Sequence, residues 1–268
     1  MIKAAVLGSP IVHSLSPLLH RTAYQLLGVE AEYSALDMQP DVARTFLATA
    51  LESGWTGFSL TMPLKETIFD LNFEVDPLAS RMRSANTLVK HDATFKASST
   101  DASAFARLLE RTKKDRVAII GGGGTARAAL GALDSSATSI DFLLRTPSRS
   151  QTLGDIAEKS RLDFFDMSHD LTSYDLVIST VPSGASVRVL GMIEKFRGTF
   201  FEVLYNPSPT QALQYAKDRG NSTFDGLDLL VEQALDQISL FSGVEFDYAS
   251  MRAELLEVGR AEIARRNA

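Results

Sequence analysis

The sequence contains no cysteine. Disulfide bonds, thiolate nucleophiles and cysteine-ligated metal sites are therefore excluded. The sequence also lacks a run of about 20 apolar residues, the length that a membrane-spanning helix needs. The apolar run at the N-terminus is too short for a signal peptide. We therefore expect a cytoplasmic protein without a membrane partner.

Positive charge is also scarce. The chain has 27 lysine and arginine residues against 33 acidic residues, and its formal net charge is −6. No basic run stands out, which argues against a nucleic-acid or anionic-membrane surface. The 4 histidines show no spacing with acidic residues that is typical of a metal site. We expect small-molecule ligands, no metal and no nucleic-acid partner, and the sequence leaves open whether the chain forms a homodimer.

What is present is a long alternation of strand-like and helical patterns. The 268 residues exceed the roughly 100–200 residues of a single domain. After residue 116, short apolar runs recur with helical patterns between them, and such βαβ units predict a parallel sheet covered on both faces. These strands are expected at residues 117–120, 140–144, 163–165, 176–179 and 199–204.

The first hundred residues alternate in a similar way. Strands are expected at residues 4–8, 33–36 and 55–61, and a hairpin is expected from 85–90 and 94–97. Helices are expected at residues 16–27, 41–53, within 65–83, and near the chain end at 227–241 and 248–266. Ser16 is expected to cap the first helix, because Pro17 follows it at the first helical position.

The pattern therefore predicts an α/β protein of two domains. We place the boundary near Asp101, where the character of the sequence shifts. The first domain comprises residues 1–101 and is completed by the C-terminal helix, residues 242–268. The second domain comprises residues 102–241.

A glycine-rich segment marks the second domain. Gly121, Gly123 and Ala126 occupy the fixed positions of G-x-G-x-x-G/A, directly after an apolar run and before a helical pattern. Glycines let the backbone approach a pyrophosphate, and the helix N-terminus offers N–H groups and positive dipole charge to the anion. We predict that this turn, with Gly124 and Thr125, binds a dinucleotide in a doubly wound, Rossmann-type domain.

The end of the next strand indicates which dinucleotide is bound. An NAD site usually places an acidic residue there to hold the ribose 2′-hydroxyl. Here the segment offers Arg145, Thr146 and Arg149, and Asp141 comes too early for that role. Two guanidinium groups suit a 2′-phosphate, which accepts paired charge-assisted hydrogen bonds. We therefore predict NADP (NADPH) as the cofactor, with NAD as the alternative.

The stretch "SLTMPLK" ends an expected strand with a single lysine, Lys65. Taken alone, this residue is interpreted as a solvated lysine at a helix start. Short polar side chains recur, however, where the strands of the first domain end: Ser14, Ser16, Ser59, Thr61, Asn86, Thr87, Thr100 and Asp101. Each one alone is explained by capping or turn chemistry. Together they suit a polyhydroxylated substrate, beside which Lys65 and Asp101 could do acid/base chemistry.

The sequence resembles the shikimate dehydrogenase family over nearly its whole length. The segments that carry this resemblance occur in the family's order: "GSPIVHSLSPLLH", "SLTMPLK", "SANTL", "STDASAF", "GGGGTARAAL", "RTPSR", "YNPSPT" and "GLDLLVEQA". The resemblance implies an NADP-dependent oxidoreductase that interconverts 3-dehydroshikimate and shikimate in aromatic amino acid biosynthesis.

The resemblance also implies roles for individual residues. It makes Lys65 and Asp101 the catalytic pair. It gives the first domain the substrate contacts and the second the cofactor, with Tyr205 and Gly226 lining the nicotinamide site. The implied substrate-binding residues are Ser14, Ser16, Thr61, Asn86, Asp101 and Gln233, to which we add Ser59 and Tyr205; Gly226 is placed with the cofactor.

Three departures from the family pattern leave the substrate open. The family commonly has asparagine where this chain has Ser59, and "NTDG" where this chain has Ser99 to Ala102. It usually has asparagine where this chain has Leu144. A quinate/shikimate dehydrogenase, or a paralogue acting on another cyclic hydroxy acid, is therefore the first alternative. A non-catalytic NADP-binding regulator is a second one, against which the intact Lys65 and Asp101 argue.

Overall fold

The computed structural model of the chain describes residues 1–206 and 208–267. Residues 1–101 and Leu230–Glu262 form one compact unit, here unit 1. Residues 102–229 form unit 2, together with the chain end from Ile263. Helix α9, Gly226–Ser242, is thus divided between the two units soon after it begins. Ala268, the last residue of the helix expected at 242–268, lies outside the described residues.

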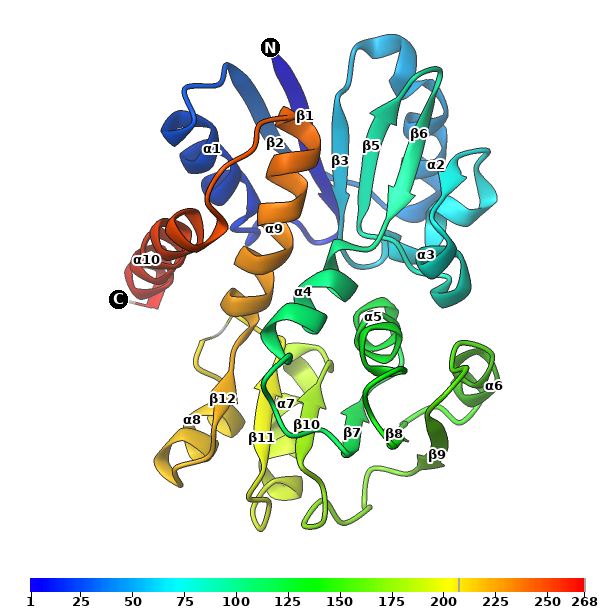
Figure 1. Ribbon diagram of the computed structural model, residues 1–268, viewed down its shortest axis with the longest axis vertical. Coiled ribbons are helices and arrows are strands. Elements are labelled where there is room, and N and C mark those ends of the chain that lie inside the picture. Colours follow the sequence, from blue (N-terminus) through cyan, green and yellow to red (C-terminus); the bar gives the residue numbers. More distant parts are fainter. Residues whose placement is uncertain (207, 268) are drawn as a thin grey trace. The chain divides into compact units, whose positions relative to one another are not determined.

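Unit 1 contains a mixed sheet (Figure 1) with the strand order β2-β1-β3-β5-β6-β4. β1 runs parallel to β2 and β3, whereas β5 pairs antiparallel with both β3 and β6. The β5–β6 pair is the hairpin that the sequence predicted. The strands are β1 Ile2–Gly8, β2 Ala31–Asp37, β3 Gly57–Leu60, β4 Glu74–Val75, β5 Thr87–His91 and β6 Thr94–Ser98.

The helices of unit 1 follow the predicted pattern, with one correction at the first helix. They are α1 Ser16–Leu26, α2 Pro40–Thr49, η1 Ala50–Ser53, η2 Leu64–Asp70, α3 Pro77–Met82 and α10 Tyr248–Asn267. Ser16 is not the N-cap of α1: that position is Leu15, which makes no side-chain capping bond. Ser14 Oγ instead accepts a hydrogen bond from the backbone N–H of Ser16 at 3.3 Å. Ser14 lies two residues upstream of Ser16, so its hydroxyl reaches the first residue of the helix. The hydroxyl of Ser16 does not cap the helix.

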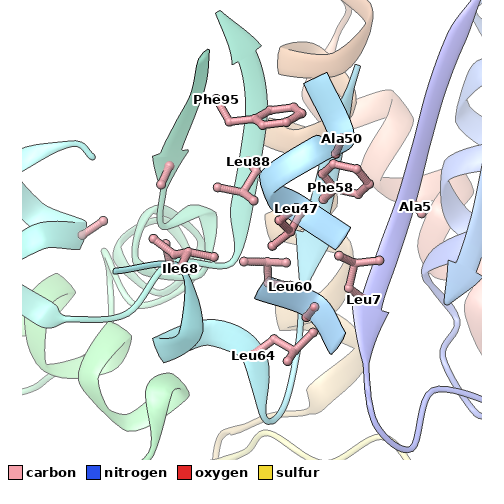
Figure 2. Packing of buried hydrophobic residues seen from close by; sticks show 14 residues of the cluster. Ala5, Leu7, Leu47, Ala50, Phe58, Leu60, Leu64, Ile68, Leu88 and Phe95 are labelled. Atoms are coloured by element: carbon pink, nitrogen blue, oxygen red, sulfur yellow. The ribbon is translucent and has the colours of Figure 1, made fainter. Parts of the chain in front are cut away.

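A hydrophobic core fixes β3, the strand that leads to Lys65. Phe58 and Leu60 of β3 pack with Leu47 of α2, Leu88 of β5 and Phe95 of β6 (Figure 2). Each of these side chains is essentially inaccessible to water. Burying one such side chain is worth about 1.5–3 kcal/mol. The end of β3 is therefore held by a rigid layer.

Unit 2 contains a parallel sheet with the strand order β12-β11-β10-β7-β8-β9 (Figure 1). All its pairings are parallel, as the βαβ pattern predicted. Its central strands read as continuous apolar runs because both of their faces are buried. The strands are β7 Arg116–Ile120, β8 Ser139–Leu143, β9 Arg161–Phe165, β10 Leu176–Ser179, β11 Thr199–Glu202 and β12 Thr223–Phe224.

The remaining helices accompany this sheet in the chain. They are α4 Thr100–Leu108, α5 Gly124–Leu133, α6 Arg149–Gly154, α7 Ser183–Met192 and α8 Gln211–Asp218. Strand and helix alternate through most of the unit, so the expected doubly wound α/β fold is confirmed. Within the part of the chain that the structure describes, no helix is both long enough and apolar enough to cross a membrane.

Candidate active site

Lys65 and Asp101 form a close ion pair in unit 1. Lys65 is the second residue of η2, and its backbone carbonyl accepts a hydrogen bond from the N–H of Ala85 at 2.9 Å. Lys65 Nζ lies 2.5 Å from Asp101 Oδ2, and the two side chains are only 15% and 7% exposed. An ammonium group that donates to a carboxylate forms a charge-assisted hydrogen bond, which is stronger than one between neutral groups. Asp101 therefore fixes the position of the lysine nitrogen.

Asn86 holds the other oxygen of the same carboxylate. Its Nδ2 donates to Asp101 Oδ1 at 3.0 Å and to Gln233 Oε1 at 3.1 Å. Its Oδ1 accepts from the backbone N–H of Thr100 at 2.7 Å. Asn86, Asp101 and Gln233 are all buried. The structure thus brings Lys65, Asp101, Asn86 and Gln233 into one hydrogen-bonded group.

Ser59 points into the protein interior. Its hydroxyl accepts from Tyr33 OH at 2.6 Å and donates to Gln237 Oε1 at 2.6 Å. A serine has one hydroxyl hydrogen, and here that hydrogen is used within unit 1. Ser59 therefore belongs to a buried network that the sequence did not predict.

Gln237 is the centre of that network. It lies four residues after Gln233 on α9, so both side chains share one helix face. It is fully buried, and its Nε2 donates to the backbone carbonyl of Asn86 at 3.2 Å and to Thr87 Oγ1 at 2.9 Å. The i, i+4 spacing was the only sequence signal for this residue. From the sequence alone, a glutamine at this position is equally consistent with a solvated side chain.

The buried His20 also contacts Gln237. Its Nε2 lies 3.3 Å from Gln237 Oε1, and its Nδ1 lies 3.2 Å from Tyr24 OH. Burial lowers the pKa of His20 to about 3 and outweighs the Gln237 hydrogen bond, which raises it. His20 is therefore neutral, and it serves the network as a hydrogen-bonding group rather than as a charge.

Ser14, Ser16 and Thr61 lie at the ends of neighbouring segments of unit 1. Ser14 and Thr61 are half-buried, and Ser16 is buried. The backbone N–H of Thr61 donates to Leu7 O at 2.9 Å, and that of Ser9 donates to Met62 O at 2.9 Å. These bonds place the loops that follow β1 and β3 side by side. Short hydroxyl side chains therefore gather at this edge of the sheet.

In unit 2 the glycine turn has the geometry that a pyrophosphate needs. Gly121 has a φ of 111°, in the region that favours glycine, and a Cβ there would collide with the Thr180 side chain. The N-cap of α5 is Gly123, and no side chain caps the helix. Gly124 and Thr125 form its first turn, and Ala126 is buried beneath them. The turn therefore fits an anionic group at the helix N-terminus.

The arginines after β8 differ in their contacts. Arg145 and Thr146 lie in an exposed loop. Arg149 begins α6 and donates from Nη1 to the backbone carbonyl of Gly122 at 2.9 Å. Asp141 is buried in β8, where it accepts from Tyr174 OH at 2.6 Å. Arg149 thus braces the glycine turn, and Asp141 is engaged inside the sheet.

Tyr205 belongs to the loop that follows β11, and Gly226 lies against the backbone of the same loop. Tyr205 lies three residues after β11, and a Cβ on Gly226 would collide with the backbone of Val203 and Leu204. The loop is anchored by Glu202, whose carboxylate accepts from Leu204 N at 3.4 Å and from Thr210 Oγ1 at 3.2 Å. Burial raises the pKa of Glu202 to about 7. Among the described residues, no group of three or more histidine or acidic side chains could hold a metal ion.

Known proteins share this architecture. The sequence profile of the shikimate dehydrogenase substrate binding domain matches residues 6–88. The shikimate dehydrogenase (NADP(+)) of Moorella thermoacetica is 35% identical over 271 residues, covering 94% of this chain and 92% of that protein.

Two solved structures are similar over nearly their whole length. The Thermus thermophilus shikimate 5-dehydrogenase in complex with NADP(H) and shikimate has a TM-score of 0.83 at 27% identity, covering 97% of this chain and 99% of that one. The Corynebacterium glutamicum quinate dehydrogenase in complex with NAD has a TM-score of 0.83 at 25% identity, covering 96% and 99%. The fold, the matched domain and the identity over most of the chain agree, and this chain therefore belongs to the shikimate dehydrogenase family.

Proposed function

We propose that this protein is an NADP-dependent shikimate dehydrogenase. It reduces 3-dehydroshikimate to shikimate, reversibly, in aromatic amino acid biosynthesis. The observation that carries the proposal is the buried Lys65–Asp101 pair, 2.5 Å apart and tied to Asn86. A fixed proton donor beside a set of hydroxyl and amide groups is what carbonyl reduction of a polyhydroxylated ring requires.

Lys65 is the acid/base group in this proposal. Bound NADPH supplies the hydride to the carbonyl carbon. Lys65 Nζ donates a proton to the carbonyl oxygen as negative charge develops there, and it accepts that proton in the reverse direction. Asp101 orients the lysine through Oδ2 while Asn86 steadies Oδ1. Because the pair is nearly closed to water, the interaction with the developing alkoxide is strong.

The hydroxyls of the strand-end loops orient the substrate. We assign ring and carboxylate contacts to Ser14, Ser16 and Thr61, and ring-hydroxyl contacts to Asn86 and Gln233. The position of Ser14, Ser16 and Thr61 in the segments that follow β1 and β3, and the hydrogen bond of Asn86 to Gln233, support this assignment. Ser59 is better assigned to support of Gln237, because its only hydrogen points inward.

The glycine turn of unit 2 holds the cofactor. We assign the pyrophosphate to Gly121, Gly123, Gly124, Thr125 and Ala126. We assign the 2′-phosphate to the loop with Arg145, Thr146 and Arg149, and the nicotinamide end to Tyr205 and Gly226. The uncapped helix N-terminus and the exposed guanidinium groups support the assignment. Unit 1 is then the substrate domain and unit 2 the dinucleotide domain.

A spectrophotometric assay tests the proposal. The purified protein is given shikimate or quinate with NADP⁺ or NAD⁺, and reduced cofactor is followed by its absorbance. We expect turnover of shikimate with NADP⁺ to exceed the other three combinations. Cofactor binding without turnover of either substrate would instead support a regulator.

A quinate/shikimate dehydrogenase is the second candidate. It is favoured by the similarity to a quinate dehydrogenase. Turnover of quinate at least equal to that of shikimate would establish it. We also propose a cytoplasmic location, which cell fractionation tests. Sedimentation tests the further hypothesis of a homodimer.

A further inference from the structure

We propose that Gln237 is a positioning residue for the Lys65–Asp101 pair. It acts through Thr87 and Asn86 and does not touch the substrate. The inference rests on the proposed function, because it concerns the same proton transfer. The orientation of the Gln237 amide sets the donor and acceptor roles in the hydrogen bonds that lead to Asp101.

The contacts of Gln237 fix which way its amide points. On one side Oε1 accepts from Ser59 Oγ at 2.6 Å and faces His20 Nε2 at 3.3 Å. On the other side Nε2 donates to Asn86 O at 3.2 Å and Thr87 Oγ1 at 2.9 Å. A flipped amide would set its NH₂ against the Ser59 and His20 side and its oxygen against a carbonyl. The observed orientation points a donor at the Asn86 carbonyl, which also accepts from the backbone N–H of Leu60 at 2.8 Å, and avoids setting one oxygen against another.

This orientation is passed on through hydroxyl groups. Thr87 Oγ1 accepts from Gln237, and its own hydrogen lies within reach of Thr100 Oγ1 at 3.0 Å and of Asn86 Oδ1 at 3.3 Å. Thr100 in turn donates to Asn86 Oδ1 at 3.2 Å, while its backbone N–H donates to the same oxygen at 2.7 Å. With its oxygen occupied in this way, Asn86 directs its NH₂ group at Asp101 Oδ1.

The chain of bonds therefore ends at the reacting group. Asp101 accepts from Asn86 on one oxygen and from Lys65 on the other, at 3.0 and 2.5 Å. Gln237, Thr87 and Asn86 are all buried, so no solvent can substitute for a missing partner. Loss of the Gln237 donors would leave the Asn86 carbonyl with the Leu60 N–H alone and would remove the donor that orients the Thr87 hydroxyl. The carboxylate that holds Lys65 would then lose its fixed position.

The test compares two buried variants of unit 1 in the full chain. Gln237→Met has similar volume but no hydrogen bonds. Tyr33→Phe is the matched control, because it removes only the outer bond to Ser59 and keeps the ring stacked on His20 at 3.9 Å. Melting temperature, kcat for shikimate oxidation and KM for NADP⁺ are measured for each. We expect kcat of Gln237→Met to fall about 10- to 100-fold, since small misplacements of a catalytic group have effects of this order. KM for NADP⁺ should stay unchanged, and Tyr33→Phe should keep kcat within about threefold.

A second variant covers the case in which Gln237→Met does not fold. Thr87→Val keeps the shape of the side chain and breaks the same path, and it should also lower kcat with KM for NADP⁺ unchanged. In the double variant, the fold-loss of kcat should be smaller than the product of the two single-variant fold-losses, because both substitutions interrupt the same path of hydrogen bonds. A kcat of Gln237→Met or Thr87→Val near that of wild type would overturn the inference. So would a Tyr33→Phe variant that loses as much kcat at an equal loss of melting temperature. Wild type without turnover of shikimate or quinate would refute the proposed function itself, and the inference with it.

Discussion

The strand ends of the two units differ in which polar groups they present, side chains in unit 1 and backbone in unit 2. In unit 1 the side chains bond to one another, as Asn86 does to Asp101 and Gln237 does to Thr87. In unit 2 the corresponding turn is formed by glycine residues, with Gly121 at its start and Gly123 as the N-cap of α5. One edge is built from hydrogen bonds between side chains, and the other from the backbone of a glycine turn, which Arg149 braces at the Gly122 carbonyl.

The difference follows from what each edge is proposed to bind. Proton transfer needs a group held within tenths of an ångström, and buried hydrogen bonds provide that. A pyrophosphate is held by backbone N–H groups, which require that no side chain stand in the way. A buried site should therefore respond to loss of a single side chain through kcat, and an open site through cofactor affinity.

Lys65→Ala should have the largest effect. We expect kcat to fall by about 10²–10⁴-fold, the usual contribution of a general acid/base group. The fold and NADPH binding should persist, because Lys65 lies in a 3-10 segment of unit 1 whose backbone bond to Ala85 remains. Steady-state kinetics at saturating shikimate, with circular dichroism and NADPH titration as controls, measure this. A variant that keeps more than about a tenth of wild-type turnover would rule out the role.

Replacing Arg145 and Arg149 by alanine should have the next largest effect, on affinity rather than on kcat. A hydrogen bond to a charged group is worth about 1.5–3 kcal/mol, roughly 10- to 150-fold in affinity. The arginines would share one phosphate, so the double variant should weaken NADPH binding by about one to three orders of magnitude.

The structure separates the two arginines. Arg145→Ala should weaken NADPH binding alone, because Arg145 lies in an exposed loop. Arg149→Ala should also weaken NADH binding to a smaller degree, because Arg149 braces the Gly122 carbonyl. Titrations of both cofactors on each single variant distinguish these cases. Equal losses for NADH and NADPH in Arg145→Ala would show that no 2′-phosphate site exists there.

Ser16→Ala should have a smaller effect, on KM for shikimate. One hydrogen bond between neutral groups is worth about 0.5–1.5 kcal/mol, which corresponds to a two- to tenfold rise in KM. Because Leu15 and not Ser16 is the N-cap, the melting temperature should hardly change. Ser14→Ala is the matched control for stability, since Ser14 Oγ accepts from the start of α1. An unchanged KM in Ser16→Ala would remove it from the substrate site.

How much the sequence could predict depends on how local each feature is. The parallel sheet and the glycine turn followed from short patterns, because apolar runs and the G-x-G-x-x-A spacing lie within one segment. The cap of α1 was predicted wrongly, since Ser14 and Ser16 compete for it and only geometry decides. β4 was missed because Glu74–Val75 is too short to carry a pattern. Gln237 was missed because its partner Asn86 lies 151 residues away, and no spacing rule links them.

The last expected effect concerns the dependence of stability on pH, which should have opposite signs in the two units. His20 has a folded pKa of about 3 against an ordinary 6.5, so between these values the unfolded chain binds more protons and stability rises with pH. Glu202 has a folded pKa of about 7 against 4.5, so between these values the folded chain binds more protons and stability falls as pH rises. The variants His20→Asn and Glu202→Gln should each remove one of these two dependences of the free energy of unfolding on pH.

Urea unfolding between pH 4 and 8 measures both slopes. Trp55, the only tryptophan, packs on Phe46 and Phe58, so its fluorescence follows unit 1, while circular dichroism follows both units. His20→Asn should flatten the fluorescence-detected rise in stability between about pH 3 and 6.5. Glu202→Gln should gain stability relative to wild type as pH rises from 4.5 to about 7, and leave the fluorescence transition unchanged. If Glu202→Gln instead lost stability increasingly over that range, the Glu202 carboxylate would stabilise the loop after β11 in its charged form. The two units would then differ less, because unit 2 too would depend on a buried side chain that is ionised.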